Sequence, residues 1–414
     1  MKKIYKFGGA SIKNLKEINN VLSILKKEVF PDLVVVFSAM DKVTNMLERV
    51  VEAYFSGEDS NARLDAVKEF HYKLMHKMFD PSDSIFNKVN NIFVEIEWVL
   101  EEPNNNSYDY YYDQIVSTGE LFSTKIMSAY LHKEGVENVW VDARDMIRTD
   151  NSYRNAKINW ELTSSAVKEQ ITTKLTITQG FIGCTSENFT TTLGREGSDF
   201  TAAILAYSLD ASEVVIWKDV PGVMNADPRF FKNTNQLMSI PYDEAIELAF
   251  YGAKVIHPKT IQPLQKKLIP LKVKSFLNPD SEGTIIHQEC VMNPSIPSFI
   301  VKENQVLISI SDSNLAFIVE EHLSNIFNLL SMHDISINMM QNSAVSFSIC
   351  VDNDLFKIPQ FIDKLRDTFQ VFYNEDLRLY TIRNYTQNEV DELLINRNLI
   401  LEQKTRNTIQ LVVK

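Results

Sequence analysis

At 414 residues, 44% of them hydrophobic and 23% charged, the chain has the composition of a globular protein with room for two or three domains. Its formal net charge of -12 opposes a nucleic-acid binder, because such proteins gather Lys and Arg on one face. The N-terminus turns polar before a signal-peptide core could form, and no apolar run approaches the ~20 residues of a membrane span. Cys184, Cys290 and Cys350 are isolated and the histidines are scattered, so we expect a cytoplasmic protein with no nucleic-acid, membrane or dedicated metal site.

The first element is a predicted strand over Ile4–Phe7, followed by a glycine loop at 8–11 and a helix over Ile12–Val29. Strand, glycine loop and helix together can cradle phosphates, because backbone N–H groups approach the oxyanions and the helix dipole favours negative charge. Lys6, just before the loop, could supply a cation to the same phosphates. A glycine pair by itself is equally typical of a structural turn.

The apolar run Leu33–Phe37 predicts a parallel strand buried on both faces. Hydroxyl side chains follow it at Ser38 and Thr44, at the carboxyl end of a strand, where open α/β sheets bind ligands. Residues 46–100 alternate helical patterns with polar breaks. Residues 101–113, rich in Asn and Tyr, are predicted as a packed or solvated loop, since they lack the basic neighbours of a base-stacking surface.

The next predicted helix opens at Ser117–Glu120 and runs to about His132. Glu120 lies in its first turn, where capping would favour an acidic residue in any case. Strands at Val139–Val141 and Leu175–Gln179, with a helix at Thr163–Glu169 between them, continue an alternation that indicates an α/β fold with a largely parallel sheet.

A central stretch, Leu193–Asp199, places Arg195 between two glycines and follows with Ser198 and Asp199. The glycines permit a sharp turn, and the Ser-Asp pair suits the start of a helix whose N-terminus attracts anions. We interpret this stretch as a place to hold a carboxylate or a phosphate. A surface turn with an ordinary helix cap is the alternative.

Beyond it, a buried strand is predicted at Glu213–Trp217 and a helix at Tyr242–Phe250. Lys218, Arg229 and Lys254 lie in the loops that follow these and neighbouring elements. Each could be a solvated surface cation. Several cations on loops that face one edge of a sheet indicate an anion site.

The pattern changes near residue 295, where two β-α-β-β units follow each other, as in small ligand-binding or dimerising modules. The first has predicted elements at Val306–Ile310, Glu320–Leu330, Ile335–Met340, Val345–Val351 and Phe356–Phe369. The second has them at Leu377–Ile382, Glu389–Leu394, Leu399–Glu402 and Ile409–Val413.

Taken together, seven short blocks resemble the aspartokinases, which are members of the amino-acid-kinase family. The blocks are Lys6–Ser11, Ser117–Glu120, Gln179–Phe181, Gly194–Asp199, Asp219–Val223, Ala226–Arg229 and Gly252–Pro258. The resemblance implies an α/β three-layer αβα domain with a mostly parallel sheet over residues 1–290. Two small α+β units of the βαββαβ type, similar to ACT regulatory domains, would follow at 298–374 and, shortened, at 375–414.

The same resemblance implies that the γ-phosphoryl group of MgATP is transferred to the side-chain carboxylate of L-aspartate, giving 4-phospho-L-aspartate and ADP. This is the first step toward lysine, threonine and methionine. ATP and Mg²⁺ are the implied cofactors, with Mg²⁺ carried on the ATP phosphates, so that no all-protein metal cage is needed. A homodimer formed through the ACT-like units is the expected assembly.

Two residues would be catalytic: Lys6 would neutralise charge on the transferring phosphoryl group, and Asp199 would orient Lys6 or the reacting groups. The residues implied for aspartate are Arg195 for a carboxylate, Glu120 for the α-ammonium, and Thr44 and Ser198 for the remaining oxygens. Those implied for the nucleotide are Gly8, Gly9, Ser11, Lys218, Asp219, Met224, Arg229 and Lys254.

Four positions depart from the family pattern. They are Ala10 in place of Thr or Ser, Glu196 in place of Gly, Lys218 in place of Ser or Thr, and Met224 in place of a common Tyr. None removes a charged catalytic group, although the affinity for nucleotide could shift. In the first ACT-like unit, Asn338 and Ala344 stand where lysine-sensing relatives carry carboxylates, so we expect lysine inhibition to be weak or absent.

Two alternatives are a related carboxylate kinase, glutamate 5-kinase or acetylglutamate kinase, and a catalytically silent amino-acid sensor. The Gly252–Pro258 block and the paired ACT-like units do not suit the kinases. The presence of Lys6, Asp199, Arg195 and Glu120 opposes the sensor.

Overall fold

The computed structural model describes residues 2–27, 32–103, 105–172, 174–253, 256–312 and 317–414. The chain divides into two compact units. The first contains Met1–Val223, Gln236–Ile246 and Val255–Asn293, and the second contains Met224–Asn235, Glu247–Lys254 and Pro294–Lys414. No helix in the described residues is both long and apolar enough to cross a membrane.

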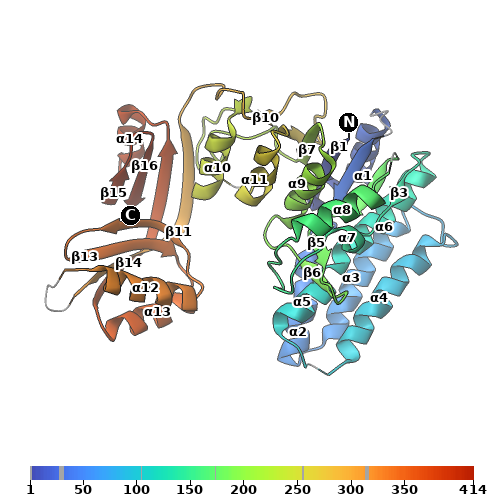
Figure 1. Cartoon of the computed structure of the whole chain (residues 1–414), viewed down its shortest axis with the longest axis horizontal. Coiled ribbons are helices and arrows are strands. Elements are labelled where there is room, and N and C mark those ends of the chain that lie inside the picture. Colours follow the sequence, from blue (N-terminus) through green and yellow to red (C-terminus); the bar gives the residue numbers. More distant parts are fainter. Residues whose placement is uncertain (1, 28–31, 104, 173, 254–255, 313–316) are drawn as a thin grey trace. The chain divides into compact units, whose positions relative to one another are not determined.

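The first unit is built on a sheet of eight strands in the order β3-β4-β2-β1-β7-β9-β10-β8 (Figure 1). The strands are β1 (Lys3–Phe7), β2 (Leu33–Phe37), β3 (Val139–Trp140), β4 (Thr176–Gln179), β7 (Glu213–Lys218), β8 (Ser239–Ile240), β9 (Leu271–Ser275) and β10 (Thr284–Ile286). Neighbours run parallel except β9 and β10, which are antiparallel. Every residue of β2 is buried, as its continuous apolar sequence predicts.

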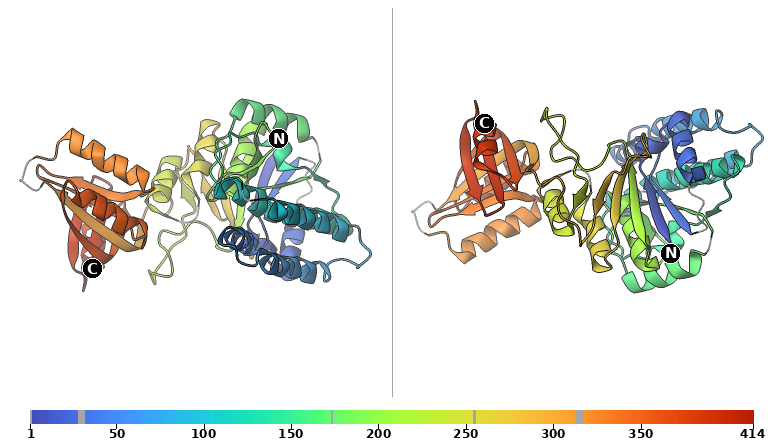
Figure 2. Two further views of the ribbon diagram at one scale, coloured as in Figure 1. Left: turned by 90° about the horizontal axis from the view of Figure 1, so that it is seen from below. Right: turned by 90° about the horizontal axis from the view of Figure 1, so that it is seen from above.

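Helices cover both faces of this sheet, which gives the predicted three layers (Figure 2). On one face, α9 (Gly197–Leu209) packs on β1, β2 and β7, with α8 (Trp160–Gln170) and α11 (Pro258–Lys266) against it. On the other, α6 (Thr118–Lys133) packs on β2, β3 and β4. Other elements of this unit are η1 (Gly9–Ile12), α1 (Leu15–Lys27), α2 (Val43–Ser56), α3 (Ser60–Met75), α4 (Ile85–Glu101), α7 (Ala143–Met146) and a hairpin of β5 (Ile182–Cys184) and β6 (Thr190–Thr192). The residues of α10 (Tyr242–Tyr251) are divided between the two units.

The loop predicted at 101–113 is wrong in its second half, because α5 (Tyr108–Val116) begins there. Ser107 caps this helix by accepting a hydrogen bond from the Tyr110 N–H. Tyr111 is buried, and its ring packs against Tyr54 and Phe55 of α2. Tyr111 is therefore part of the packing surface between α5 and α2.

The second unit contains one antiparallel sheet of six strands, in the order β12-β13-β11-β14-β16-β15. Its elements are β11 (Ser298–Ser311), α12 (Glu320–Met332), β12 (Ile337–Asn342), β13 (Ser346–Asp352), α13 (Lys357–Arg366), β14 (Gln370–Arg383), α14 (Gln387–Leu394), β15 (Leu399–Lys404) and β16 (Thr408–Val413). The order of strands and helices matches the predicted repeat.

The two repeats share their long strands instead of forming separate sheets one after the other. The start of β11, Ser298–Lys302, pairs with the end of β14, and its end, Leu307–Ser311, pairs with the start of β14. Phe299 and Val301 pack on the core around α14, whereas Val306 and Ile308 belong to the core under α12 and α13. The predicted boundary at 374–375 thus falls inside β14, and β11 serves both repeats.

Candidate active site

The carboxyl ends of the central parallel strands meet at one edge of the first unit's sheet, and Lys6 lies there, next to the last residue of β1. The neighbouring Phe7 ring stacks between Phe37 of β2 and Trp217 of β7, with centroids 5.5 and 5.8 Å away, which fixes the end of the strand. After it, a Cβ on Gly9 would lie only 2.6 Å from the Ala39 carbonyl oxygen, so this turn requires glycine.

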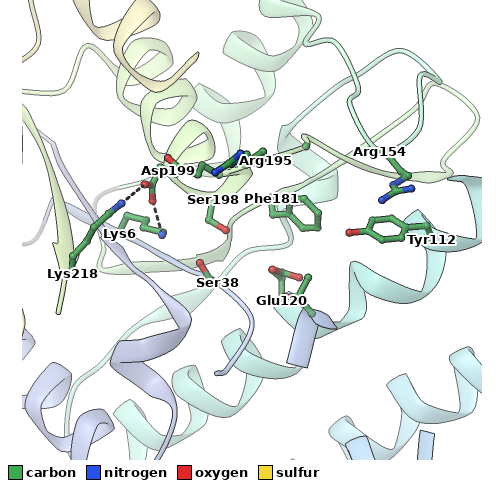
Figure 3. A pocket seen from close by; sticks show the side chains of 14 residues that line it. Lys6, Ser38, Tyr112, Glu120, Arg154, Phe181, Arg195, Ser198, Asp199 and Lys218 are labelled. Atoms are coloured by element: carbon green, nitrogen blue, oxygen red, sulfur yellow. Dashed lines mark ion pairs between the residues drawn. The ribbon is translucent and has the colours of Figure 1, made fainter. Parts of the chain in front are cut away.

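A cavity of about 430 Å³ opens at this edge, and fourteen residues line it (Figure 3). They are Lys6, Ser38, Thr44, Tyr112, Glu120, Arg154, Phe181, Gly194, Arg195, Glu196, Gly197, Ser198, Asp199 and Lys218. Every residue predicted as catalytic or as aspartate-binding is in this set, together with Lys218 from the predicted nucleotide residues.

Asp199 holds two lysines at one wall of the cavity. Its Oδ1 lies 2.5 Å from Lys6 Nζ and its Oδ2 lies 3.4 Å from Lys218 Nζ. Only 2% of Asp199 is exposed, so burial raises its pKa, but the two ammonium groups outweigh burial and hold the pKa below the ordinary value. The cluster therefore presents two cations on one ionised carboxylate.

Glu120, in the first turn of α6, presents a buried carboxyl to the same cavity. Its Oε1 accepts a hydrogen bond from the Ala39 N–H at 3.2 Å, while the buried Oε2 has no hydrogen-bond partner among the described residues. Burial raises the pKa of Glu120 to about 8, against smaller opposing effects that include the Lys6 ammonium. A bound cation that donates to Oε2 would satisfy this atom and favour the ionised form.

Close packing fixes the start of α9 against the end of β4. A Cβ on Gly180 would lie 2.4 Å from the Cβ of Ser198, so glycine is required for this approach. The Phe181 N–H donates to Thr201 Oγ1 at 2.9 Å, which ties the same loop to the first turns of the helix. Ser198 is thereby placed on the cavity wall, with Arg195 exposed just before it.

Of the other predicted nucleotide residues, those within the described part of the chain do not line this cavity. Gly8 and Gly9 lie in the turn after β1, and Ser11 Oγ donates to the Gly8 carbonyl at 2.6 Å, which stabilises that turn. Asp219 follows β7. Met224 and Arg229 belong to the second unit, where Asp227 holds the Arg229 guanidinium, and Lys254 is outside the described residues. Their roles remain predictions.

The cavity also contains residues that were not among the predicted site residues: Ser38, Tyr112, Arg154, Phe181, Gly194, Glu196 and Gly197. Ser38 was noted as a hydroxyl at a strand end that could face a ligand, and Phe181 ends the block Gln179–Phe181. Arg154 comes from a turn, with a left-handed φ of 64°, and its guanidinium lies 4.3 Å over the Tyr112 ring. Helical spacing of the tyrosines could have predicted α5, but not the packing that brings Tyr112 to Arg154.

Comparisons with known proteins show the family to which the chain belongs. The model of the amino acid kinase family matches residues 1–275. The lysine-sensitive aspartokinase 3 of Escherichia coli is 32% identical over 353 residues, covering 84% of this chain and 78% of that protein. The chain belongs to the amino acid kinase family and, within it, to the aspartokinases.

Solved aspartokinases share the architecture of this family member. E. coli aspartokinase III in complex with aspartate and ADP, in the R-state, matches with a TM-score of 0.86 and 28% identity. Its complex with lysine and aspartate, in the T-state, matches with a TM-score of 0.84 and the same identity. Both alignments cover 100% of this chain and 96% of that one.

Proposed function

We propose that the enzyme transfers the γ-phosphoryl group of ATP to the side-chain carboxylate of L-aspartate, giving 4-phospho-L-aspartate and ADP. The observation that carries the proposal is that one cavity contains both the lysine pair on Asp199 and the unpaired carboxyl oxygen of Glu120. Two cations suit a transferring phosphoryl group, and a buried carboxylate suits an ammonium group.

The enzyme would recognise aspartate through side chains of both charges, one for its ammonium group and one for its carboxylate. Glu120 Oε2 accepts a hydrogen bond from the α-ammonium group of aspartate, and the planar guanidinium of Arg195 binds the α-carboxylate. Thr44 and Ser198, both on the cavity wall, donate to remaining carboxylate oxygens. N-acetylglutamate has no ammonium group and would leave Glu120 Oε2 unsatisfied, which opposes acetylglutamate kinase as the function.

At the phosphoryl end, Lys6 and Lys218 stabilise the negative charge of the γ-phosphoryl oxygens, and Asp199 keeps both ammonium groups in place. Positioning and electrostatics carry most of the rate in phosphoryl transfer, because the protein forms no covalent bond to the group. The side-chain carboxylate of aspartate is then the attacking nucleophile and ADP is the leaving group.

Mg²⁺ is part of the proposal as a cation carried by the ATP phosphates. The described residues contain no group of three or more His, Cys, Asp and Glu side chains that could hold a metal, so the phosphates would supply its main ligands. Gly8, Gly9, Ser11, Asp219, Met224, Arg229 and Lys254 stay as proposed nucleotide residues. A cytoplasmic homodimer that assembles through the second unit completes the proposal.

An ATP-dependent hydroxamate assay tests this function with three acceptors: aspartate, glutamate and buffer alone. We expect hydroxamate to form with aspartate. With glutamate, the amount of hydroxamate should not exceed that of the buffer control. Equal product from glutamate would indicate a glutamate kinase. No product with any acceptor would indicate a sensor without kinase activity.

A further inference from the structure

The first unit contains another pocket, separate from the cavity at Lys6. Its volume is about 460 Å³, which is within the range of small-molecule sites, and ten residues line it. They are Lys3, Tyr5, Glu213, Val215, Met238, Lys272, Lys274, Glu282, Gly283 and Ile285. None of these ten residues lines the cavity at Lys6. We call this second space the sheet-face pocket.

The register of the strands places the sheet-face pocket on one face of the sheet. Paired residues across β1, β7, β9 and β10 are Tyr5, Val215, Lys272 and Ile285. Such paired residues point to the same face, whereas neighbours along a strand point to opposite faces. Lys6, the residue after Tyr5, therefore points to the other face, where α9 supplies its ionic partner. The pocket lies over these four strands, beyond β2, β3 and β4, on which α6 packs.

The floor of the sheet-face pocket is apolar. Tyr5 and Val215 line it although only 3% of Tyr5 and 2% of Val215 is exposed, so these two side chains lie at its bottom. Met238 and Ile285 also line it and are half-buried. A hollow with such a floor can take an aromatic or aliphatic group out of water.

Lysine side chains supply the positive charge of this pocket. The ammonium groups of Lys3 and Lys272 lie 2.7 Å from Oε1 and Oε2 of Glu213, respectively. Burial acts to raise the pKa of Glu213, but hydrogen bonds from the two lysines outweigh burial and hold the pKa below its ordinary value. Glu213 is therefore ionised, and its carboxylate fixes two ammonium groups at the pocket.

Lys274 adds a third cation on the same face. Its Nζ lies 5.3 Å from the centroid of the Trp217 ring, a contact that restrains the side chain. In the described part of the chain, no ion pair joins Lys274 to a carboxylate. Together with the exposed Glu282, the lining contains three lysines and two glutamates. It thus has one positive charge in excess, in a chain whose formal net charge is -12.

We propose that the sheet-face pocket binds a small monocarboxylate with an apolar body. The carboxylate pairs with the Lys274 ammonium, and the body packs on Tyr5 and Val215. One excess positive charge suits a ligand with one negative charge, and the apolar floor suits a ligand whose other end is not hydrated. A polyphosphate has several charges and no apolar part, so it fits this pocket poorly. The inference is independent of the proposed kinase function.

Fluorescence titration of the full chain with anilinonaphthalene sulfonate, an aromatic monoanion, tests the site. Its uncharged relative phenylnaphthylamine is the matched ligand. We expect Lys274→Met to raise the Kd of the sulfonate by about tenfold and to leave that of the uncharged probe within about twofold, because only the ionic contact is lost. Ile285→Trp, which fills the pocket without changing its charge, should weaken both probes by about tenfold or more. Lys88→Met, at an exposed position of α4 outside the pocket, is the control and should change neither Kd.

Displacement of the sulfonate probe extends the test to carboxylates. Phenylacetate should displace it from wild type, whereas the uncharged phenylacetamide at the same concentration should not. Equal Kd values in wild type and Ile285→Trp would place the probes elsewhere and overturn the site, as would lack of sulfonate binding to wild type. Equal displacement by acid and amide, or no effect of Lys274→Met, would overturn the choice of an anion. Thermal unfolding confirms that each variant is folded, and Lys274→Gln replaces Lys274→Met if the latter is not.

Discussion

At the scale of single residues, Lys6 carries the largest expected effect on the reaction. Its ammonium lies 2.5 Å from Asp199 in the cavity and would approach the γ-phosphoryl group. A unit charge ~4 Å from another contributes roughly 4 kcal/mol at an effective dielectric constant of ~20. We expect Lys6→Met to lower kcat by at least ~100-fold in a coupled ADP-release assay.

The control for this variant is Lys3→Met, on the same strand. Lys3 pairs with Glu213 at 2.7 Å and lies outside the cavity lining, so its loss should leave kcat within about twofold of wild type. Near-normal turnover in Lys6→Met would remove Lys6 from the mechanism.

Glu120 should make the stability of the protein depend on pH. Because burial raises its pKa from 4.5 to about 8, the native state keeps a proton that the unfolded state releases between those values. The contribution of Glu120 to the free energy of unfolding is therefore greatest below pH 4.5 and falls as pH rises toward 8. The Glu120→Gln variant lacks this pH-dependent loss of stability. Its free energy of unfolding in urea, relative to that of wild type, should therefore increase as pH rises from 4.5 to 8. A difference independent of pH would contradict the assigned shift.

Residues in short local motifs could be predicted from the sequence as candidates for this cavity. Lys6, Arg195 and Asp199 stand beside glycines and strand ends, so local chemistry marks them. Tyr112 and Arg154 could not be found this way, because their meeting depends on α5 packing against a turn some forty residues later. The unpaired Glu196 oxygen depends on three-dimensional burial, which no sequence pattern reports.

At the scale of elements, α3 contains the fully buried His71 within the helical layer. Its Nδ1 is 2.8 Å from the Val67 carbonyl oxygen, and its ring packs on Phe93 and Phe122. Burial lowers the pKa of His71 from 6.5 to about 4. Between these pH values His71 is protonated in the unfolded state and neutral in the native state. Stability is therefore full above pH 6.5 and is lost as pH falls through 6.5 toward 4.

His71→Met fills the same space with an adaptable apolar side chain and removes the titrating group. The loss of unfolding free energy between pH 6.5 and pH 4 should therefore shrink by up to about 3 kcal/mol. Unfolding free energies measured at several pH values in that window compare the two proteins. Equal slopes would show that His71 titrates normally in the native state.

Most elements were predictable from clear apolar patterns: a continuous apolar run in β2, and helical periodicity in α12 and α13. The aromatic run of α5 was missed because asparagines precede it and its tyrosines have weak helix propensity, while packing on α2 decides the outcome. The sharing of β11 and β14 was missed because strand pairing is set by register over long sequence separations, and a repeat pattern shows only the order of elements.

At the scale of the whole molecule, the sheet of the second unit bears on regulation by lysine. Asn338 is fully engaged: its Oδ1 accepts from Lys302 Nζ at 2.6 Å, and its Nδ2 donates to Gln305 and Asp352. The amide oxygen of Asn338 thus already accepts a hydrogen bond from an ammonium group of the protein itself, and Ala344 has no carboxylate to pair with a lysine ligand. A ligand shifts a conformational equilibrium only through its differential affinity for the two states.

We therefore expect L-lysine to change activity by less than about twofold up to millimolar concentration. Initial rates across a lysine titration at fixed aspartate and ATP provide the measurement. Strong inhibition at micromolar lysine would show that this unit senses lysine in spite of these residues.

The transfer itself can be followed with aspartate labelled with oxygen-18 in its side-chain carboxylate. Enzyme, ATP and labelled aspartate form the acyl phosphate. Hydroxylamine then attacks its carbonyl carbon and expels phosphate together with the bridging oxygen. If the side-chain carboxylate attacks the γ-phosphorus in the cavity at Lys6, mass spectrometry will find one labelled oxygen in the released phosphate. Phosphate without label would mean that water, and not aspartate, receives the phosphoryl group.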